Sequence, residues 1–176
     1  MNEHDYYMKL ALSLAAEAGS CGEAPVGAVV VDSNGAVIGR GRNRREETRS
    51  ATAHAEIEAI EEACEVLGDW RLSGCSLYVT LEPCPMCAGA VIMSRIDKLY
   101  YGARDEVTGS CGSVINIFME SYGQSTKVTG DILADECGAI LTKFFKELRK
   151  TCQGDDSIVS QASRCQNQSG SFDRSL

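Results

Sequence analysis

The chain has 176 residues, 44% hydrophobic and 24% charged, with a formal net charge of −8 at pH 7. This length suits one domain with a full core and is short for two, and no apolar run approaches the roughly eighteen residues of a membrane span. The first residues, MNEHDYYMKL, begin with acids and lack the basic segment of a signal peptide. We therefore expect a cytoplasmic protein without a membrane segment, and its acidity disfavours nucleic-acid binding except through a local basic patch.

In the first half of the chain, hydrophobic periodicity predicts a helix, a hairpin and a second helix. The first helix is expected over residues 3–19, and the hairpin over 26–31 and 36–44 with a DSNG turn between its strands. After a polar loop, the second helix is expected over about 53–67. The apolar stripes expected to face the core are Tyr7, Leu10, Ala11, Leu14, Ala15 and Ala18 in the first helix and Ile57, Ile60, Cys64 and Leu67 in the second.

The second half continues this alternation. Strands are expected over 76–81 and 98–103, with a short helix over about 85–94 between them. A glycine-rich loop, a weak strand near residue 127 and a last helix over about 134–150 follow. The side chains that this last helix is expected to bury are Leu141, Phe144, Phe145 and Leu148. Alternating strands and helices predict an α/β layered domain whose strands are at least partly parallel.

The composition changes at residue 151. From there to residue 176 the chain is rich in Ser, Gln, Asn, Asp and Gly and poor in apolar residues. Such a segment cannot bury enough surface to offset the entropy of ordering it. We expect residues 1–150 to form the functional domain and residues 151–176 to form a polar, disordered tail.

Nine cysteines are a high and odd number for this length. In a chain without a signal peptide, they indicate reduced thiols and candidate metal ligands, and not a disulfide framework. Cys84 and Cys87 lie three residues apart at the expected start of a helix, so that both sulfurs point the same way. Pro85 suits the first helical turn, and the positive end of the helix dipole lowers the pKa of both thiols.

A histidine elsewhere in the chain can complete this set of ligands. His54 opens the second helix in TAHAEIEAI, two residues before Glu56. Two cysteines and one histidine leave a tetrahedral zinc with one open position, the arrangement of a catalytic site. That position takes a water of lowered pKa, and Glu56 is the expected base that moves its proton. Residues i and i+2 of a helix point about 200° apart, so both reach the metal only if the helix begins here, with Thr52 as the expected N-cap.

The same residues allow other interpretations. The Cys-x-x-Cys pair also suits a redox pair, or half of a structural four-cysteine site completed by Cys64, Cys75, Cys111 or Cys137. In that second class of protein, a non-catalytic structural zinc module, Glu56 is only a first-turn carboxylate. His-x-Glu at one helix start and Pro-Cys-x-x-Cys at another form a specific combination, which favours the catalytic interpretation.

These motifs resemble those of the zinc-dependent nucleoside and nucleobase deaminases, whose signature is H-x-E followed by P-C-x-x-C. Within that superfamily the chain is most similar to the bacterial tRNA-specific adenosine deaminases, over about residues 3–150. The segments that carry the resemblance are, in order, EAPVGAVVV, GRNR, TAHAEI, LYVTLEPCPMCAGA, YGARD, GSCGS and ILADECGAIL.

The resemblance implies hydrolytic deamination of adenosine to inosine at the wobble position of a tRNA anticodon, with one zinc ion (Zn²⁺) per subunit. By motif, the zinc ligands are His54, Cys84 and Cys87, and Glu56 is the proton shuttle. The implied fold is a cytidine-deaminase-like, three-layer α/β/α sandwich around a five-stranded mixed sheet. The implied assembly is a homodimer that binds the tRNA anticodon loop.

The resemblance also implies four residues at the substrate. Asn43 of GRNR matches an asparagine that contacts the bound nucleotide, and Ala55 is small enough to lie under the base. Pro83 precedes the first cysteine ligand, and Asp105 of GARD matches an acid that faces the anticodon loop. The family motif is often GARD-x-K, but Val107 takes the place of the lysine here, so one phosphate contact is expected to be absent.

Two short segments hold nine of the seventeen basic residues: Arg40, Arg42, Arg44, Arg45 and Arg49, then Lys143, Lys146, Arg149 and Lys150. The arginine segment leads into the expected site and suits a single-stranded RNA loop, whereas the lysines of the last helix suit an ordinary solvated face. A rival activity is the deamination of a small molecule such as guanine, cytidine or deoxycytidylate, because the zinc motifs do not encode the substrate.

Overall fold

The computed structural model describes residues 2–120, 122, 123 and 125–152. Its elements are α1 (Glu3–Ser20), β1 (Gly27–Val31), β2 (Val37–Arg42), α2 (Arg45–Thr48), α3 (Ala55–Leu67), β3 (Ser76–Leu81), α4 (Pro85–Met93), β4 (Lys98–Ala103), the 3₁₀ helix η1 (Ile117–Met119), β5 (Lys127–Thr129) and α5 (Ala134–Cys152). No helix among these residues is long and apolar enough to cross a membrane. Residues 151 and 152 still belong to α5, and the rest of the expected tail lies outside the described residues.

The five strands form one mixed sheet in the order β2-β1-β3-β4-β5. β1 pairs antiparallel with both β2 and β3, whereas β3, β4 and β5 run parallel to one another. The parallel register pairs Leu81 with Ala103, so β3 and β4 end side by side. The chain segments that follow these two strands therefore start from the same edge of the sheet.

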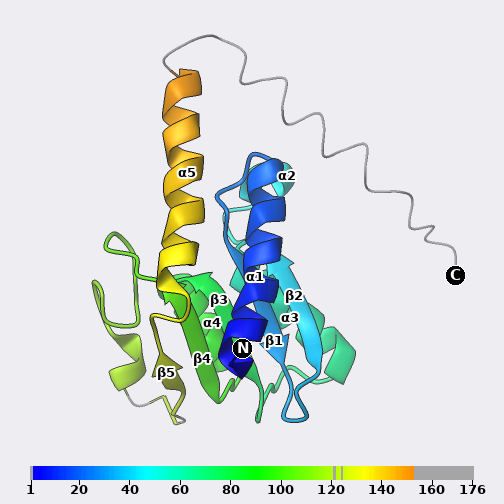
Figure 1. Cartoon of the computed structure of the whole chain (residues 1–176). Coiled ribbons are helices and arrows are strands. Elements are labelled where there is room, and N and C mark those ends of the chain that lie inside the picture. The colour runs from blue at the N-terminus through cyan, green and yellow to red at the C-terminus, as the bar shows by residue number, and fades with distance from the viewer. Residues whose placement is uncertain (1, 121, 124, 153–176) are drawn as a thin grey trace, which may run out of the picture.

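Helices cover both faces of this sheet (Figure 1). α3 and α4 pack on one face, where they share the larger hydrophobic core with Leu77 and Leu99 of the sheet. α1 and α5 cover the other face, and Met8, Ala11 and Cys137 form a buried cluster between them. This arrangement confirms the predicted three-layer α/β/α fold with a five-stranded mixed sheet.

α3 lies unusually close to β2 because small residues face each other across the contact. A Cβ atom at Gly39 would overlap the carbonyl oxygen of Ala59, and one at Gly41 would overlap that of Ala55. The buried residues of α3 are Ala55, Glu56, Ala59, Ile60 and Ala63. The predicted stripe of larger residues was therefore wrong in part, since Leu67 is 45% exposed.

Two other local predictions also differ from the structure. The polar loop before α3 contains a single helical turn, α2, which the hydrophobic pattern does not indicate because it buries no residue. Phe145 and Leu148 were expected in the core, but they are 44% and 42% exposed. α5 extends past the end of the sheet (Figure 1), and its second half has little of the domain to pack against.

The contact between α3 and β2 can be tested with Gly41→Ala. The added methyl group would overlap the Ala55 carbonyl oxygen and lie 2.6 Å from the Ala59 nitrogen, so the start of α3 must move. Overpacking of this kind destabilises a protein by about 1–3 kcal/mol, and we expect weaker metal binding as well. Denaturant unfolding and metal analysis measure the two effects.

Gly138→Ala in α5 is the matched control. A Cβ atom at Gly138 meets nothing within 4 Å, and alanine is favoured over glycine within a helix by roughly 0.5–1 kcal/mol. A Gly41→Ala protein as stable as the Gly138→Ala protein would contradict the close contact between α3 and β2.

Candidate active site

Two helices of the same layer begin at the candidate metal site, and each has a predicted ligand as its N-cap. His54 precedes α3 with φ −89° and ψ 153°, and Cys84 precedes α4 with φ −71° and ψ 171°. Neither side chain makes a capping hydrogen bond, so both are available to a metal. The prediction of Thr52 as the N-cap of α3 was wrong by two residues, but the requirement that the helix begin at His54 is met.

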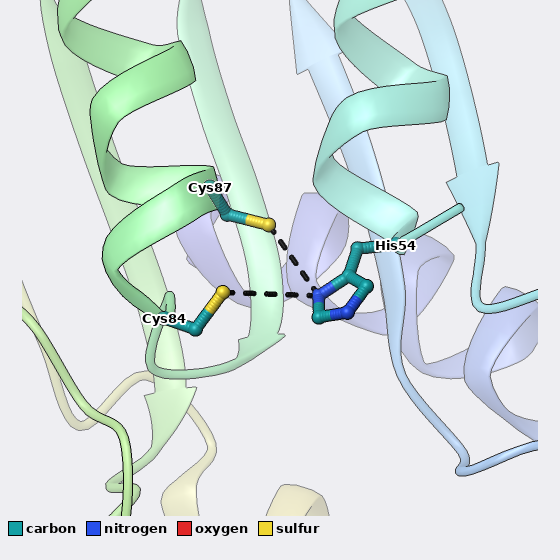
Figure 2. Close-up of side chains that lie close together, drawn as sticks. All are labelled: His54, Cys84 and Cys87. Atoms are coloured by element: carbon teal, nitrogen blue, oxygen red, sulfur yellow. Dashed lines mark hydrogen bonds between the residues drawn. The ribbon is translucent and has the colours of Figure 1, made fainter. Parts of the chain in front are cut away.

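The three predicted metal ligands lie together (Figure 2). The Nδ1 atom of His54 is 3.8 Å from the Cys84 sulfur and 3.5 Å from the Cys87 sulfur. The candidate ligand atoms all lie within 4.8 Å of one another. In a tetrahedral zinc site, bonds of about 2.3 Å to sulfur and about 2.0 Å to nitrogen separate these atoms by about 3.5 Å. The residues therefore fit zinc with little movement.

The protons of these ligands are distributed unequally. The hydrogen bond between the two thiols lowers the pKa of Cys84 to about 4, with a further contribution from His54. The same hydrogen bond, together with burial, raises the pKa of Cys87, so the expectation that both thiols have a lowered pKa was wrong for Cys87. The hydrogen bond to Cys84 raises the pKa of His54. Zinc needs deprotonated ligands, so its binding competes with protons at Cys87 and His54.

Glu56 lies beside the three ligands but is not one of them. It is only 4% exposed, and its burial raises its pKa to about 7. The Cys87 thiol and the His54 ring both act on its carboxyl group, which places the group next to the metal position. Because the cluster of metal-binding atoms does not include Glu56, its carboxyl group remains available for proton transfer.

No other cysteine of the described residues completes a structural site. The free thiols are Cys64, Cys75, Cys84, Cys87, Cys111 and Cys137, and only the two ligands belong to the cluster. Three protein ligands leave one position of a tetrahedral metal open, which distinguishes a catalytic zinc site from a closed structural one. The expectation of reduced thiols holds for these six residues and is wrong for Cys21, which is disulfide-bonded.

Two of the predicted substrate residues adjoin zinc ligands in the chain, and a third is next to a residue held beside the start of α3. Asn43 is 7% exposed, and its side-chain nitrogen is 3.5 Å from a carboxylate oxygen of the buried Glu23. The next residue, Arg44, donates its backbone N–H to the Ala53 carbonyl oxygen at 3.0 Å, which holds this segment beside the start of α3. Ala55 and Pro83 are both buried and adjoin the ligands His54 and Cys84.

Asp105, the fourth predicted substrate residue, lies in the loop after β4, and its side chain is engaged locally. Its carboxylate accepts hydrogen bonds from Val107 N–H at 2.9 Å and from Thr108 N–H at 3.2 Å. The Thr108 hydroxyl donates to it as well, at 2.5 Å. Asp105 therefore closes a turn within this loop, and its contact with a substrate stays a prediction.

Two buried glutamates near the site were missed in the sequence analysis. Glu23 accepts the backbone N–H groups of Glu46 and Glu47, at 2.9 and 2.8 Å, and so holds the start of α2. Glu82 is 2% exposed and binds the loop that follows β4. The available signal was a single glutamate in each of two largely apolar stretches, EAPVGAVVV and LYVTLEPC.

The arginine segment is only partly available to a ligand. Arg42 pairs with Glu17 and Glu47, at 3.3 and 2.9 Å, and Arg44 also pairs with Glu47, at 2.9 Å. Arg45 is exposed and close enough to His54 to act on its pKa. A positive charge at the edge of the site is therefore supplied by Arg45.

Comparison with known proteins agrees with this geometry. A family model described as the cytidine and deoxycytidylate deaminase zinc-binding region matches residues 1–103. The chain is 48% identical over 151 residues to a tRNA-specific adenosine deaminase from Bacillus subtilis, an alignment that covers 85% of this chain and 93% of the relative.

Solved structures show the same similarity. A structure from a study of A-to-I editing by tRNA:A34 deaminases matches with a TM-score of 0.74 and 45% identity, covering 77% of this chain and 99% of that one. A guanine deaminase from Nitrosomonas europaea matches with a TM-score of 0.71 and 28% identity, covering 80% of this chain and 83% of that one.

The ligand set predicts different outcomes for two cysteine variants. Cys87→Ser removes a thiolate from the cluster, and we expect the zinc content of the purified protein to fall far below one per chain. Cys64→Ser changes a free thiol outside the cluster and should leave the zinc content unchanged. Elemental analysis by mass spectrometry measures both, and full zinc occupancy in Cys87→Ser would contradict the assignment.

Proposed function

Because the chain belongs to the tRNA-specific adenosine deaminases within the cytidine and deoxycytidylate deaminase zinc-binding family, we propose that it hydrolyses adenosine to inosine at the wobble position of a tRNA anticodon. The observation that carries this proposal is the cluster of His54, Cys84 and Cys87 with a buried carboxyl group beside it. These three residues hold zinc, one ion per chain, and leave one coordination position open.

The reaction replaces the amino group of adenine with oxygen from water and releases ammonia. Zinc, when bound, supplies a water molecule that is nucleophilic near neutral pH. Glu56 is the residue that moves protons, from the water to the nitrogen that leaves. A carboxyl group whose burial raises its pKa to about 7 can both accept and donate a proton under these conditions.

We assign the substrate contacts to residues on either side of the cluster. Asn43 is held by Glu23 at 3.5 Å and presents an amide to the nucleotide. Ala55 and Pro83, both buried and each next to a ligand in the chain, are assigned to the apolar lining of the site. Asp105 shapes the loop that faces the rest of the anticodon. An adenosine turned out of a single-stranded loop can enter such a site without the opening of a duplex.

RNA binding by an acidic chain requires a local basic surface. Arg45 supplies it at the site itself, since it is exposed and acts on His54, and the exposed Arg40 and Arg49 flank it in the sequence. Val107 is 82% exposed where related proteins often have lysine. The arginines therefore carry most of the contact with phosphate.

We further propose that the enzyme is a homodimer and that it acts on tRNA in the cytoplasm. Met93 at the end of α4 and Met119 of η1 are 65% and 82% exposed, and these two elements are in contact. An exposed apolar surface of this kind is typical of an interface between copies. A single-chain mass in analytical ultracentrifugation of the zinc form would contradict the dimer.

The role of Glu56 is tested with Glu56→Gln in a panel of substrates. The unaltered protein should convert the wobble adenosine of an anticodon stem-loop to inosine. The Glu56→Gln variant should lose at least about 10²-fold in kcat while it keeps its zinc. Glu61→Gln, which removes a charge from the exposed face of α3, is the control with unchanged activity. Mass spectrometry of the nucleosides measures the product.

The other members of the panel separate the rival functions. They are the same stem-loop with guanosine at the wobble position, free guanine, cytidine and deoxycytidylate. Turnover of a free molecule with the adenosine stem-loop untouched would favour the small-molecule rival, of which the similar guanine deaminase is an example. No turnover of any substrate by the zinc-loaded protein would favour a structural zinc module.

Contact with phosphate predicts a salt-dependent affinity. For single-stranded RNA, the logarithm of the binding constant falls with the logarithm of salt concentration by about 0.7 per phosphate contact. Arg45→Ala should weaken stem-loop binding and reduce this slope by about that amount. Arg71→Ala, an exposed arginine beyond the opposite end of α3, should leave the slope unchanged. A binding constant of the unaltered protein that does not change with salt concentration would contradict contact with phosphate.

A further inference from the structure

Glu82 is a buried charge whose role the chemistry at zinc does not explain. Its side chain is 2% exposed, and it lies at the end of β3, two residues before the ligand Cys84. It does not belong to the metal-binding cluster. Burial of a carboxylate costs free energy unless its oxygens accept hydrogen bonds. The groups that donate to Glu82 therefore indicate its role.

Within the part of the chain that the structure describes, the hydrogen bonds to the Glu82 carboxylate all come from one loop, residues 105–113 after β4. The backbone N–H of Asp105 donates to one carboxylate oxygen at 3.1 Å, and the N–H groups of Cys111 and Ser113 donate to the other at 2.9 and 3.1 Å. The Ser113 hydroxyl donates a fourth hydrogen bond. The carboxylate therefore joins the beginning of the loop to its end.

The loop is shaped to surround this carboxylate. Gly109 lies against it, since a Cβ atom there would be 2.6 Å from the Glu82 carboxyl carbon and would overlap the Asp105 carbonyl oxygen. The N–H of Ser110 donates to the Pro83 carbonyl oxygen at 2.9 Å. The loop is thus tied to Glu82 and Pro83, the two residues that immediately precede a zinc ligand.

The same loop borders the metal site. Cys111 packs against the core cluster that contains Ala55, the residue before Glu56, so the end of the loop lies near the start of α3, while Asp105 lies at the beginning of the loop. A loop of this length without its own regular structure is expected to be mobile unless it is anchored. The four hydrogen bonds to one buried charge provide the anchor.

We propose that Glu82 is a positioning residue that fixes loop 105–113 as one wall of the substrate site and so determines the affinity for the anticodon loop. This proposal rests on the proposed function for the identity of the substrate. It assigns Glu82 no contact with the reacting atoms, because its oxygens are occupied by the loop. Loss of the anchor should therefore affect substrate binding more than chemistry.

The test compares Glu82→Gln with Glu61→Gln in the zinc-loaded protein. In Glu82→Gln the new amide group opposes donors of the loop, and we expect KM for the adenosine stem-loop to rise by about tenfold or more, with kcat within about threefold and zinc content unchanged. Glu61→Gln should match the unaltered protein. The dissociation constant of the stem-loop is measured in proteins that also carry Glu56→Gln, with and without Glu82→Gln. It should be higher with Glu82→Gln, in parallel with KM.

Gly109→Ala is a second variant that keeps the Glu82 charge and displaces the loop. It should raise KM in the same way, and it decides the question if Glu82→Gln fails to fold. A fall in kcat with unchanged KM would overturn the proposal, because Glu82 would then act in the chemistry. Unchanged kinetics in either folded variant would also overturn it.

Hydrogen exchange separates failure of this proposal from failure of the proposed function. The amides of Cys111 and Ser113 should exchange faster in Glu82→Gln than in the unaltered protein, whatever the substrate is. If the unaltered protein does not act on the stem-loop, the proposed function fails, and with it the part of this proposal that concerns anticodon affinity. Unchanged exchange in Glu82→Gln would overturn the anchor itself.

Discussion

The metal centre depends on the close contact between α3 and β2. Gly39 and Gly41 leave room for the backbone of α3, and this contact fixes where the helix begins. α3 begins at Ala55, so His54 is its N-cap and Glu56 lies in its first turn. Both residues are therefore at the end of α3 that faces the cysteine ligands at the start of α4. A helix that began one turn earlier would send these two side chains to opposite sides.

Three buried glutamates have different roles, which depend on the hydrogen bonds that each accepts. Burial raises the pKa of Glu56 to about 7, although its own backbone N–H and His54 act to lower it. Burial acts in the same direction on Glu82, but bonds from Ser113, Asp105 and Cys111 outweigh it and lower its pKa. Glu23 likewise accepts backbone N–H groups, from α2. Glu56 therefore has a pKa suited to proton exchange. Glu82 and Glu23 each hold a neighbouring segment of the chain by hydrogen bonds.

Much of this was predictable from local patterns. The strands, the larger helices and the ligands were found because periodicity and the two short motifs each depend on few neighbouring residues. The apolar face of α3 was predicted from its large residues. It is formed mainly by alanines, because they pack against glycines of β2 that are distant in the sequence. The exposure of Phe145 and Leu148 depends on how far α5 extends past the sheet. The roles of Glu23 and Glu82 depend on loops brought to them by the fold, which no local pattern encodes.

The proposed chemistry requires that zinc is held by two sulfurs and one nitrogen, with a fourth position open to solvent. X-ray absorption at the zinc edge of the purified protein measures this directly. We expect two sulfur atoms at about 2.3 Å and two lighter atoms at about 2.0 Å, one from His54 and one from water. A shell of four protein ligands, with three or four sulfur atoms, would contradict it and would make the site structural.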